Sequence, residues 1–393
     1  MTPALATLLA SPTLAKLLDV LPNARLVGGC VRDALLGRPV KDIDLAVPYP
    51  PEQTMRLLRE AAIEARPTGL DHGTVTAIVD GQSFEVTSLR RDTAQDGRHA
   101  VVIYTEDWRE DAARRDLTIN ALSVDRHGEL HDYVGGFDDL RNRRVRFVGE
   151  PEMRMREDYL RILRFFRFHA FYGEGPPDPD ASAAAERLAG NLVLLSAERV
   201  TAEILRLLEA PRVVSTWQVM VERGIIAHVL PGAVRIDRLA RLVAAEERLG
   251  FSPSPIRRLC AVIAPIDRPK ALAILRLSGA QQKAIAMTEA VSDLSTDAAL
   301  RAAMYWLGAA PVIDHLLIDQ PEGWENHLAW ARGWAMPSFP LTGKHLIDLG
   351  VAPGPQMGAL LARVERWWIG EDFRPGRAEC LAYLRTLIGS KAM

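Results

Sequence analysis

The stretch RLVGGCVRDALLGRPVKDIDLAV, residues 25–47, places two glycines, an arginine and two alternating aspartates in one short length of chain. RLVGG followed by CVRDALLG predicts a strand, a glycine turn at Gly28 and Gly29, and then a helix. This geometry leaves backbone N–H groups free at the start of a helix, where a phosphate can bind. Two adjacent glycines can also make nothing more than a tight turn, so the neighbouring residues decide between the two interpretations.

The aspartates of KDIDLAV are the second part of this pattern. Asp42 and Asp44 lie two residues apart at the start of an apolar strand, so their carboxylates are predicted to project from the same face of a sheet. Carboxylates held this close repel each other unless a cation lies between them, and oxygen-rich sites of this kind hold Mg²⁺ (magnesium) together with substrate phosphates. Glu85, a lone acid in the β-forming run SFEVTSLRR, completes a three-carboxylate cluster if its strand pairs beside the first. A solvated strand edge is the alternative interpretation.

Length, composition and cysteine usage limit the class of protein. The chain has 393 residues, enough for two to four domains. Charges or prolines interrupt every apolar stretch well short of the roughly 18 residues of a membrane-spanning helix, and the N-terminal leucines repeat at helical spacing without a basic region, so we expect a cytoplasmic protein with no membrane segment. Three scattered cysteines support neither a disulfide framework nor a zinc site. A net charge of −2 argues against a globally basic surface for nucleic acid.

The pattern of the sequence changes near residue 150. Short β-rich runs, LTINALSV the last of them, occupy residues 24–148, and long Leu, Ala, Arg and Glu segments with helical periodicity follow. This change predicts an α+β head, with a small sheet, on a helical remainder. In that remainder, basic residues recur at roughly helical spacing, either as a stripe that tracks RNA phosphates or as solvated helix faces. They are Arg235, Arg238, Arg241, Arg248, Arg257, Arg258, Lys270 and Lys283.

Seven motifs occur in order between residues 25 and 168: GGCVRDALLG, KDIDLAV, EVTSLR, RRDLTINALS, DYVGGFDDL, RVRFVGEP and REDYLRILRFFRF. In order and spacing they resemble the class II tRNA nucleotidyltransferase and bacterial poly(A) polymerase family, within the DNA polymerase β-like nucleotidyltransferase superfamily. A weaker resemblance to the C-terminal region of that family covers residues 341–364. The resemblance implies a polymerase β-like head with a small mixed sheet, followed by an all-helical neck, body and tail. We place these parts at residues 1–148, 149–210, 211–335 and 336–393.

The resemblance implies nucleotidyl transfer, in which two metal ions roughly 3.5–4 Å apart stabilise the attacking 3′-hydroxyl and the leaving pyrophosphate. We expect Asp42 and Asp44 to hold Mg²⁺, with Glu85 as the third catalytic carboxylate. Gly28 and Gly29 then face the nucleotide.

Cationic side chains are expected to bind the triphosphate, because phosphoryl chemistry of this kind depends on positioning and charge stabilisation. The candidates are Arg32, in the helix after the glycine turn, and Arg114 and Arg115 in RRDLTINA. Arg115 is the preferred member of that pair, although the sequence does not separate them. Asp116 and Asn120 organise the loop and the sugar site, or have purely structural roles.

The stretch REDYLRILRFFRF predicts one amphipathic helix over residues 156–168. A salt-bridged wet face is one interpretation of its charges. Base recognition is the other, because an Asp acceptor beside an Arg donor matches the exocyclic amine and ring nitrogen of cytosine and adenine, and opposes guanine and uracil. By resemblance, Asp158 and Arg161 form this template and Glu157 braces them. Arg164 and Arg167 line the same nucleotide site.

These features together imply a CCA tRNA nucleotidyltransferase, which builds or repairs the 3′-terminal CCA of tRNA from CTP and ATP with Mg²⁺; no partner protein is implied. A poly(A) polymerase of the same family shares every catalytic motif. A CC-adding-only enzyme is disfavoured by the long polar loop between residues 91 and 113, which relatives of that kind have shortened. A catalytically silent RNA-binding protein is disfavoured by Asp42 and Asp44, which it has no reason to retain.

Overall fold

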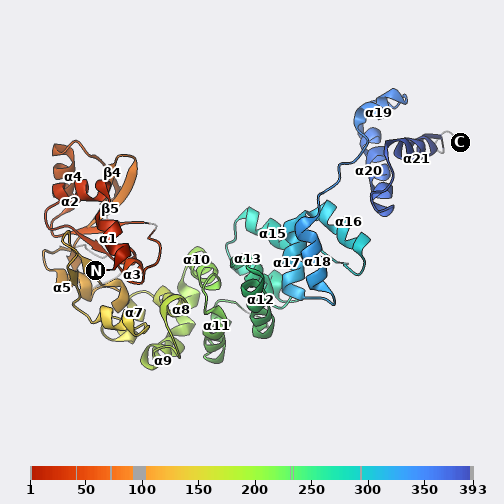
Figure 1. Cartoon of the computed structure of the whole chain (residues 1–393). Helices are drawn as coiled ribbons and strands as arrows, with labels where there is room; N and C mark the ends of the chain where they lie inside the picture. The colour runs from red at the N-terminus through yellow and green to blue at the C-terminus, as the bar shows by residue number, and fades with distance from the viewer. Residues whose placement is uncertain are drawn as a thin grey trace. The chain divides into compact units, whose positions relative to one another are not determined.

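The computed structural model describes residues 2–40, 42–70, 73–91, 103–230, 232, 234–292 and 294–389. Residues 92–102, about half of the polar loop expected between residues 91 and 113, lie outside the described residues. The described part of that segment is not all loop, since it contains β7 (Ile103–Tyr104) and α5 (Trp108–Ala113). The chain divides into two compact units, Met1–Pro231 and Gly232–Met393 (Figure 1). The first unit holds the sheet, and the described part of the second unit is helical. The α+β class predicted from the sequence is confirmed.

A mixed sheet of seven strands, counted over the described residues, is the framework of the head. Its spatial order is β3-β4-β5-β2-β1-β8-β9, and every neighbouring pair is antiparallel except β2 and β5, which run parallel. The strands are β1 (Arg25–Val27), β2 (Asp44–Val47), β3 (Glu64–Gly69), β4 (Thr74–Val79), β5 (Gln82–Ser88), β8 (Ser123–Val124) and β9 (Leu130–His131). A separate ribbon pairs β6 (Arg90–Arg91) with β7 (Ile103–Tyr104).

The register between β2 and β5 places the acids of the head. Asp44 is paired with Glu85, the pairing on which a three-carboxylate cluster depends. Leu45 and Val86, the next residues of the two strands, are buried. β5 alternates between buried and more exposed residues, whereas Leu45, Ala46 and Val47 of β2 are all buried. β2 begins at Asp44, so Asp42 lies just before the strand. The sequence analysis had placed both aspartates at the start of the strand.

Short helices cover the sheet, and several begin at a proline because proline lacks the N–H that a first helical turn leaves unpaired. They are α1 (Pro3–Leu9), α2 (Pro12–Val20), α3 (Gly29–Leu35), α4 (Pro51–Glu60), α5 (Trp108–Ala113) and α6 (Gly136–Arg141). α2 buries Leu14, Leu17 and Leu18, the periodic leucines of the N-terminal sequence.

The strand expected over LTINALSV, residues 117–124, is only partly correct. Residues Thr118–Asn120 form a 3₁₀ turn, η2, and the strand is reduced to β8. The reason is side-chain hydrogen bonding that a strand cannot supply: the Thr118 hydroxyl donates to buried Asp139 at 2.7 Å, and the Asn120 amide donates to Asp116 at 3.2 Å.

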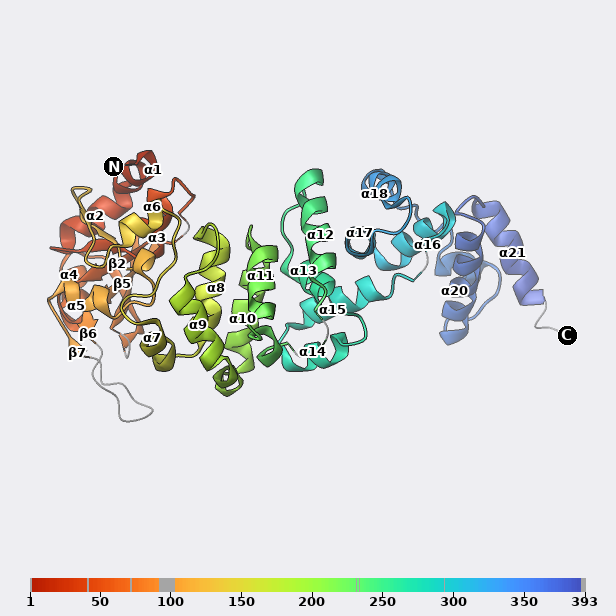
Figure 2. The ribbon, with the colours of Figure 1, turned by 90° about the horizontal axis from the view of Figure 1, so that it is seen from below.

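The remainder of the first unit consists of helices, of which α8 packs against both α10 and α11 (Figure 2). The elements are α7 (Pro151–Glu157), α8 (Leu160–Tyr172), α9 (Pro179–Leu188), η3 (Ala189–Leu194), α10 (Ala197–Leu208), α11 (Val213–Glu222) and η4 (Ile226–His228). α11, which the sequence assigned to the start of the body, thus packs with the helices assigned to the neck.

The single helix predicted over residues 156–168 is wrong. α7 ends at Glu157, Asp158 has an extended backbone (φ −156°, ψ 109°), and α8 begins at Leu160. The Asp158 side chain explains the break, because its Oδ1 accepts a hydrogen bond from the Leu160 amide at 3.1 Å and so pairs a group left open at a helix start.

The second unit contains ten helices among its described residues. They are α12 (Ile236–Leu249), α13 (Pro255–Val262), α14 (Arg268–Ile274), α15 (Gly279–Glu289), α16 (Asp297–Leu307), α17 (Ala309–Asp319), α18 (Trp324–Gly333), α19 (Gly343–Asp348), α20 (Pro355–Gly370) and α21 (Arg377–Gly389). Leu346, Val364, Trp368 and Leu384 form a hydrophobic cluster that joins α19, α20 and α21. No helix of the described residues has the length and apolar character needed to cross a membrane.

Candidate active site

A pocket of about 520 Å³ brings the opening motif of the sequence against helix α8. Gly29, Arg32, Asp42 and Asp44 line it from the head, and Tyr172 lines it from the end of α8. Its volume lies within the range of pockets that hold nucleotide-sized ligands. Gly28 caps α3 with φ +68°, a conformation that favours glycine, and it directs the chain into the helix beside the pocket.

The carboxylates at this pocket lack a full countercharge. Burial, followed by the charges of Glu85 and Asp42, raises the pKa of Asp44 above its usual value, and Arg115 only partly opposes that rise. Neighbouring carboxylate oxygens that repel one another are the donor set of a divalent-cation site. The acids present are therefore compatible with a divalent cation.

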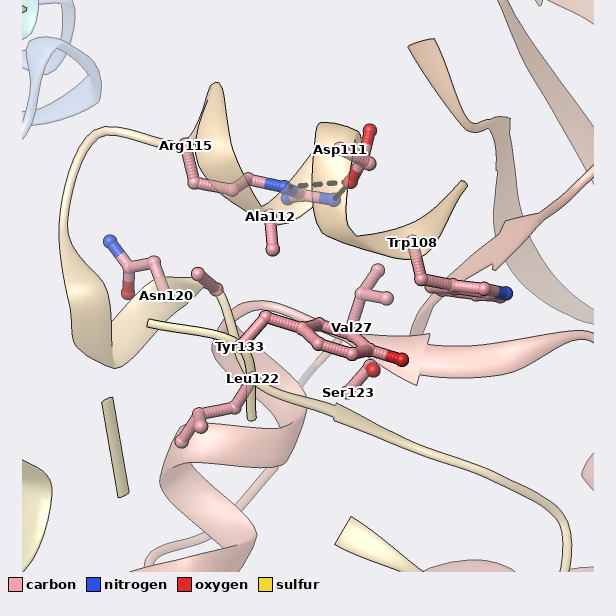
Figure 3. A pocket seen from close by; sticks show the side chains of 10 residues that line it. Val27, Trp108, Asp111, Ala112, Arg115, Asn120, Leu122, Ser123 and Tyr133 are labelled. Atoms are coloured by element: carbon pink, nitrogen blue, oxygen red, sulfur yellow. Dashed lines mark hydrogen bonds and ion pairs between the residues drawn. The ribbon is translucent and has the colours of Figure 1, made fainter. Parts of the chain in front are cut away.

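The two arginines of RRDLTINA, which the sequence left equivalent, differ in the structure, and Figure 3 shows the second of them, Arg115. Arg114 donates to Asp111 at 2.6 Å and 2.8 Å and to the Arg90 carbonyl at 2.9 Å. Arg115 donates to the other oxygen of Asp111 at 3.0 Å and 3.2 Å. Its Nη1 lies 3.9 Å from the place that a Cβ on Gly28 would occupy. Arg115 is therefore the member of the pair that faces the glycine turn.

Arg32 lines the pocket but is already held on several sides. Its guanidinium forms a two-point ion pair with Asp33, at 2.9 Å and 3.1 Å, and donates to Asn120 Oδ1 at 2.6 Å. It also lies over the Tyr172 ring, 4.2 Å from the centroid. A ligand thus meets an arginine whose orientation is set before binding.

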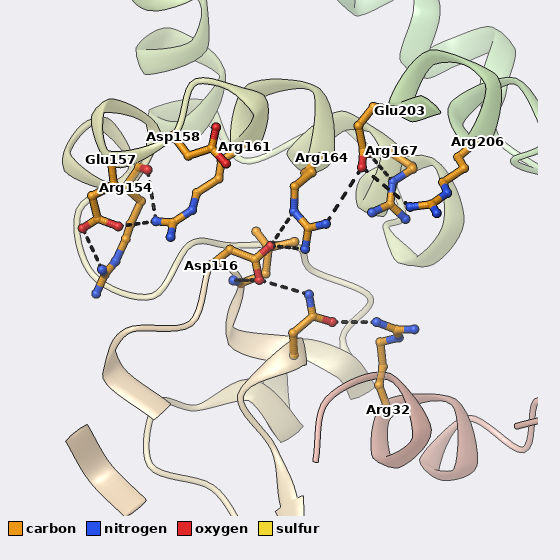
Figure 4. A network of polar contacts seen from close by, with 12 residues as sticks. Arg32, Asp116, Arg154, Glu157, Asp158, Arg161, Arg164, Arg167, Glu203 and Arg206 are labelled. Carbon is orange, nitrogen blue, oxygen red and sulfur yellow. Dashed lines mark hydrogen bonds and ion pairs between the residues drawn. The ribbon is translucent and has the colours of Figure 1, made fainter. Parts of the chain in front are cut away.

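A polar network connects the head to the helices that follow it (Figure 4). Asn120 joins Arg32 to Asp116, and Asp116 accepts two hydrogen bonds from Arg164 at 2.5 Å and 2.9 Å. Glu203, from α10, accepts from Arg167 at 2.6 Å. Sequence reasoning had no signal for Glu203, because its partner lies on a different helix.

Burial alone disfavours the charged form of Asp116, but the charge and hydrogen bonds of Arg164, with those of Asn120 and the Leu117 amide, lower its pKa overall. Asp116→Asn should therefore destabilise the full chain at pH 7 by about 1–3 kcal/mol. A depressed carboxyl pKa stabilises the fold above the unfolded-state pKa of about 4, and this stabilisation is lost as the pH falls through the folded-state value. Thermal unfolding of both proteins between pH 3 and 7 measures the difference, which should shrink on acidification.

Asp180→Asn, at an exposed acid of α9, is the control for that experiment and should leave the melting temperature unchanged. If Asp116→Asn and the parent were equally stable at pH 7, the contacts of Asp116 would not stabilise the fold.

The two members of the predicted base-reading pair meet through the backbone, where the Arg161 amide donates to the Asp158 carbonyl at 2.9 Å, and their side chains have other partners. Asp158 Oδ2 accepts from Arg199 Nη2 at 2.6 Å, whereas Arg161 pairs with Glu157 and donates to the Arg154 carbonyl at 3.1 Å. Glu157 also accepts from Arg154 at 2.8 Å. The structure thus places Glu157 beside Arg161 and adds Arg199, which the sequence did not indicate.

A second group of possible metal ligands occurs in the β8–β9 hairpin, where Asp125, Glu129 and His131 bring ligand atoms within 4.8 Å of one another. Asp125 Oδ1 already accepts hydrogen bonds from the His127 and Glu129 amides, and its Oδ2 lies 3.3 Å from His131 Nε2. Hydrogen bonds within the hairpin turn therefore explain why these three side chains lie close together.

The arginines expected to form a phosphate stripe in the helical remainder do not all reach the surface. Arg238 and Arg258 are buried, and Arg258 pairs with buried Glu246 at 2.8 Å. Arg248 is exposed and pairs with Glu325 at 2.6 Å. Helical spacing alone does not distinguish these environments, because an ion-paired arginine can face the interior.

Comparisons with known proteins identify the family of the head and of the helices that follow it. Residues 24–146 match the family model described as "Poly A polymerase head domain", and residues 177–236 match "Probable RNA and SrmB- binding site of polymerase A". The fold and the site therefore define a nucleotidyltransferase with a polymerase-type head.

The relatives define the family more closely. The chain is 33% identical over 378 residues to "CCA tRNA nucleotidyltransferase 1, mitochondrial" of Mus musculus, covering 92% of this chain and 86% of that protein. It is 33% identical over 375 residues to the "CCA-adding enzyme" of Lacticaseibacillus paracasei, covering 91% and 90%. The crystal structure of the Bacillus stearothermophilus CCA-adding enzyme in complex with CTP superposes with a TM-score of 0.74 at 26% identity, covering 100% of this chain and 99% of that one. The chain belongs to the tRNA nucleotidyltransferase and poly(A) polymerase family, as its motifs predicted.

Proposed function

We propose that the protein adds or repairs the 3′-terminal CCA of tRNA, without a nucleic-acid template, from CTP and ATP and with release of pyrophosphate. The observation that carries this proposal is the meeting of Asp42, Asp44 and Arg32 in one pocket with Tyr172 of α8. The names of the Mus musculus and Lacticaseibacillus paracasei relatives and the CTP complex of the structural relative support CCA addition as the reaction.

In this proposal Asp42 and Asp44 hold two Mg²⁺ ions, and Glu85 adds a third carboxylate beside Asp44. The ions, when bound, neutralise charge on the attacking 3′-oxygen and the leaving pyrophosphate. Arg115 supports the triphosphate from the side of the glycine turn, and Arg32 does so from α3. Gly28 and Gly29 allow the phosphates to approach the backbone closely.

Base selection is assigned to the start of α8. Asp158 accepts from the exocyclic amine of cytosine or adenine, and Arg161 donates to the adjacent ring nitrogen. Each already has a partner at this site, Asp158 with Arg199 and Arg161 with Glu157, so a bound base shares or replaces an existing contact. Arg164 and Arg167 line the same nucleotide site.

The same proposal assigns a role to each part of the chain. The head, residues 1–148, carries the catalytic carboxylates, and the neck, 149–210, reads the base. The body and the tail, residues 211–335 and 336–393, bind tRNA. We also propose a cytoplasmic location, which the buried and unpaired state of all three cysteines supports and which cell fractionation tests.

The number of adenosines added distinguishes this function from poly(A) synthesis, which the family model for the head also describes. With ATP alone and a tRNA that already ends in CC, we expect one adenosine to be added and the reaction to stop, because a pocket of limited volume has no room for a longer primer end. Gel electrophoresis of a 3′-extended tRNA resolves the products. Long tails on unstructured RNA would identify a poly(A) polymerase, and failure to add any adenosine would identify a CC-adding enzyme.

A further inference from the structure

Asp111, in α5, is an acid that the motifs of the head did not single out. Its side chain is buried, with 4% of the residue exposed, and it carries two arginines at once. Oδ1 accepts two hydrogen bonds from Arg114. Oδ2 accepts two from Arg115 (Figure 3). Two donors of each guanidinium group thus converge on one carboxylate oxygen, and these charge-assisted hydrogen bonds restrict how that group can turn.

One carboxylate between two guanidinium groups leaves one positive charge in excess. The two arginines differ in where their remaining donors lie. Arg114 directs its Nε also to the Arg90 carbonyl at 2.9 Å, and its side chain is 13% exposed. Arg115 is 24% exposed and uses Nε and Nη2 on Asp111, which leaves Nη1 beside Gly28. The excess charge therefore lies at the glycine turn.

We infer that Asp111 is a positioning residue that holds the Arg115 guanidinium at the glycine turn, where it meets the triphosphate of the incoming nucleotide. The inference rests on the proposed function, because Arg115 has a triphosphate to meet only in nucleotidyl transfer. Asp111 itself touches neither the nucleotide nor the metal ions. It acts by orienting one arginine and by keeping two like-charged groups in place.

Asp111→Asn tests this role. The amide keeps the shape of the side chain but removes the negative charge and can accept through only one oxygen, so the two guanidinium groups repel and Arg115 loses its fixed orientation. We expect the KM for CTP and the KM for ATP to rise together by about 10-fold to 100-fold. The KM for tRNA and the preference for CTP and ATP over UTP and GTP should not change, since a phosphate contact does not distinguish bases. Asp111→Glu should restore part of the loss.

Asp139→Asn is the matched control. Asp139 is also a buried carboxylate of the head held between two arginines, Arg144 and Arg146, at 3.3 Å and 2.9 Å. Unlike Arg115, neither of these arginines is among the neighbours that a Cβ at Gly28 would meet within 4 Å. Both variants should lower the melting temperature of the full chain, whereas only Asp111→Asn should raise the nucleotide KM. Equal nucleotide KM values in the two variants, or a rise in the tRNA KM that matches the rise for CTP, would overturn the positioning role.

A binding measurement separates failure of this inference from failure of the proposed function. Inorganic tripolyphosphate with Mg²⁺ is titrated into the full chain by calorimetry, and cytidine is titrated separately. Asp111→Asn should weaken tripolyphosphate binding by the same factor as the KM and leave cytidine binding unchanged. If the parent binds tripolyphosphate but adds no nucleotide to tRNA, the reaction is wrong and the role of Asp111 is still measured. If Asp111→Asn binds tripolyphosphate as tightly as the parent, the positioning role is wrong.

Discussion

Replacing Asp44 by Asn is expected to lower kcat for nucleotide incorporation at least about 100-fold and, in the metal-free protein, to raise the melting temperature. The loss follows because a catalytic metal supplies several kcal/mol of charge stabilisation and each 1.36 kcal/mol of that is about tenfold in rate. The rise in melting temperature follows from the raised pKa of Asp44, which is caused by burial first and then by the charges of Glu85 and Asp42. The ionised Asp44 carboxylate that metal binding needs therefore destabilises the fold when no metal ion is bound.

The raised pKa of Asp44 determines how its contribution to stability depends on pH. A carboxyl group with a raised folded-state pKa contributes its stabilisation fully below the unfolded-state pKa, and this contribution is lost as the pH rises through the folded-state pKa. A neutral Asn at this position avoids that loss. Thermal unfolding in the presence of a chelator, from pH 4 to 8, should therefore show an advantage of Asp44→Asn that grows with pH. Single-nucleotide incorporation with Mg²⁺ measures the loss of activity.

Glu129→Gln is the control for the metal assignment. Glu129 belongs to the other cluster of possible metal ligands, in the β8–β9 hairpin, and its replacement should leave both incorporation and its Mg²⁺ dependence unchanged. Turnover at the parent rate in Asp44→Asn would rule out Asp44 as a metal ligand. A large loss of activity in Glu129→Gln would move the functional metal to the hairpin.

Replacing Asp158 by Ala is expected to lower kcat/KM for CTP and ATP together and to reduce their advantage over UTP and GTP. The lost hydrogen bond to the exocyclic amine is worth about 1–3 kcal/mol, or roughly 5-fold to 150-fold in kcat/KM. The substitution also frees Arg199, which pairs with Asp158 at 2.6 Å and is then left with a donor that suits the carbonyl oxygens of uracil and guanine. Initial rates on one tRNA primer with each nucleotide in turn give the four ratios.

Glu152→Gln is the matched control for that experiment. Glu152 lies one helix earlier, in α7, and pairs with Arg156 and Arg187 at the surface, so its loss removes an acid with two arginine partners but leaves the contacts of Asp158 with Arg199 and Leu160 in place. Its selectivity should equal that of the parent. If Asp158→Ala rejected UTP and GTP as sharply as the parent does, the segment would have only a structural role and base selection would reside elsewhere.

Much of the fold and part of the site could be predicted from local sequence. The apolar residues of IDLAV and SFEVTSL predicted β2 and β5, and the glycine pair predicted the turn before α3, because strand alternation and positive φ are properties of a few consecutive residues. The helical character after residue 150 was predicted for the same reason. The exceptions were side chains that compete with the backbone: Thr118 and Asn120 replaced a strand by a turn, and Asp158 divided a helix.

The sequence by itself determined which chemistry is present: two aspartates after a glycine turn, a pair of adjacent arginines, and an acid followed by arginines at helical spacing. Only the tertiary structure decided which of these groups meet. The parallel register of β2 and β5 put Glu85 beside Asp44, the fold placed Arg115 beside Gly28, and Asp116 reached Arg164 in a later helix. The physical reason is that such contacts depend on strand register and on the packing of side chains far apart in the chain, whereas local periodicity reports only the face on which each residue lies.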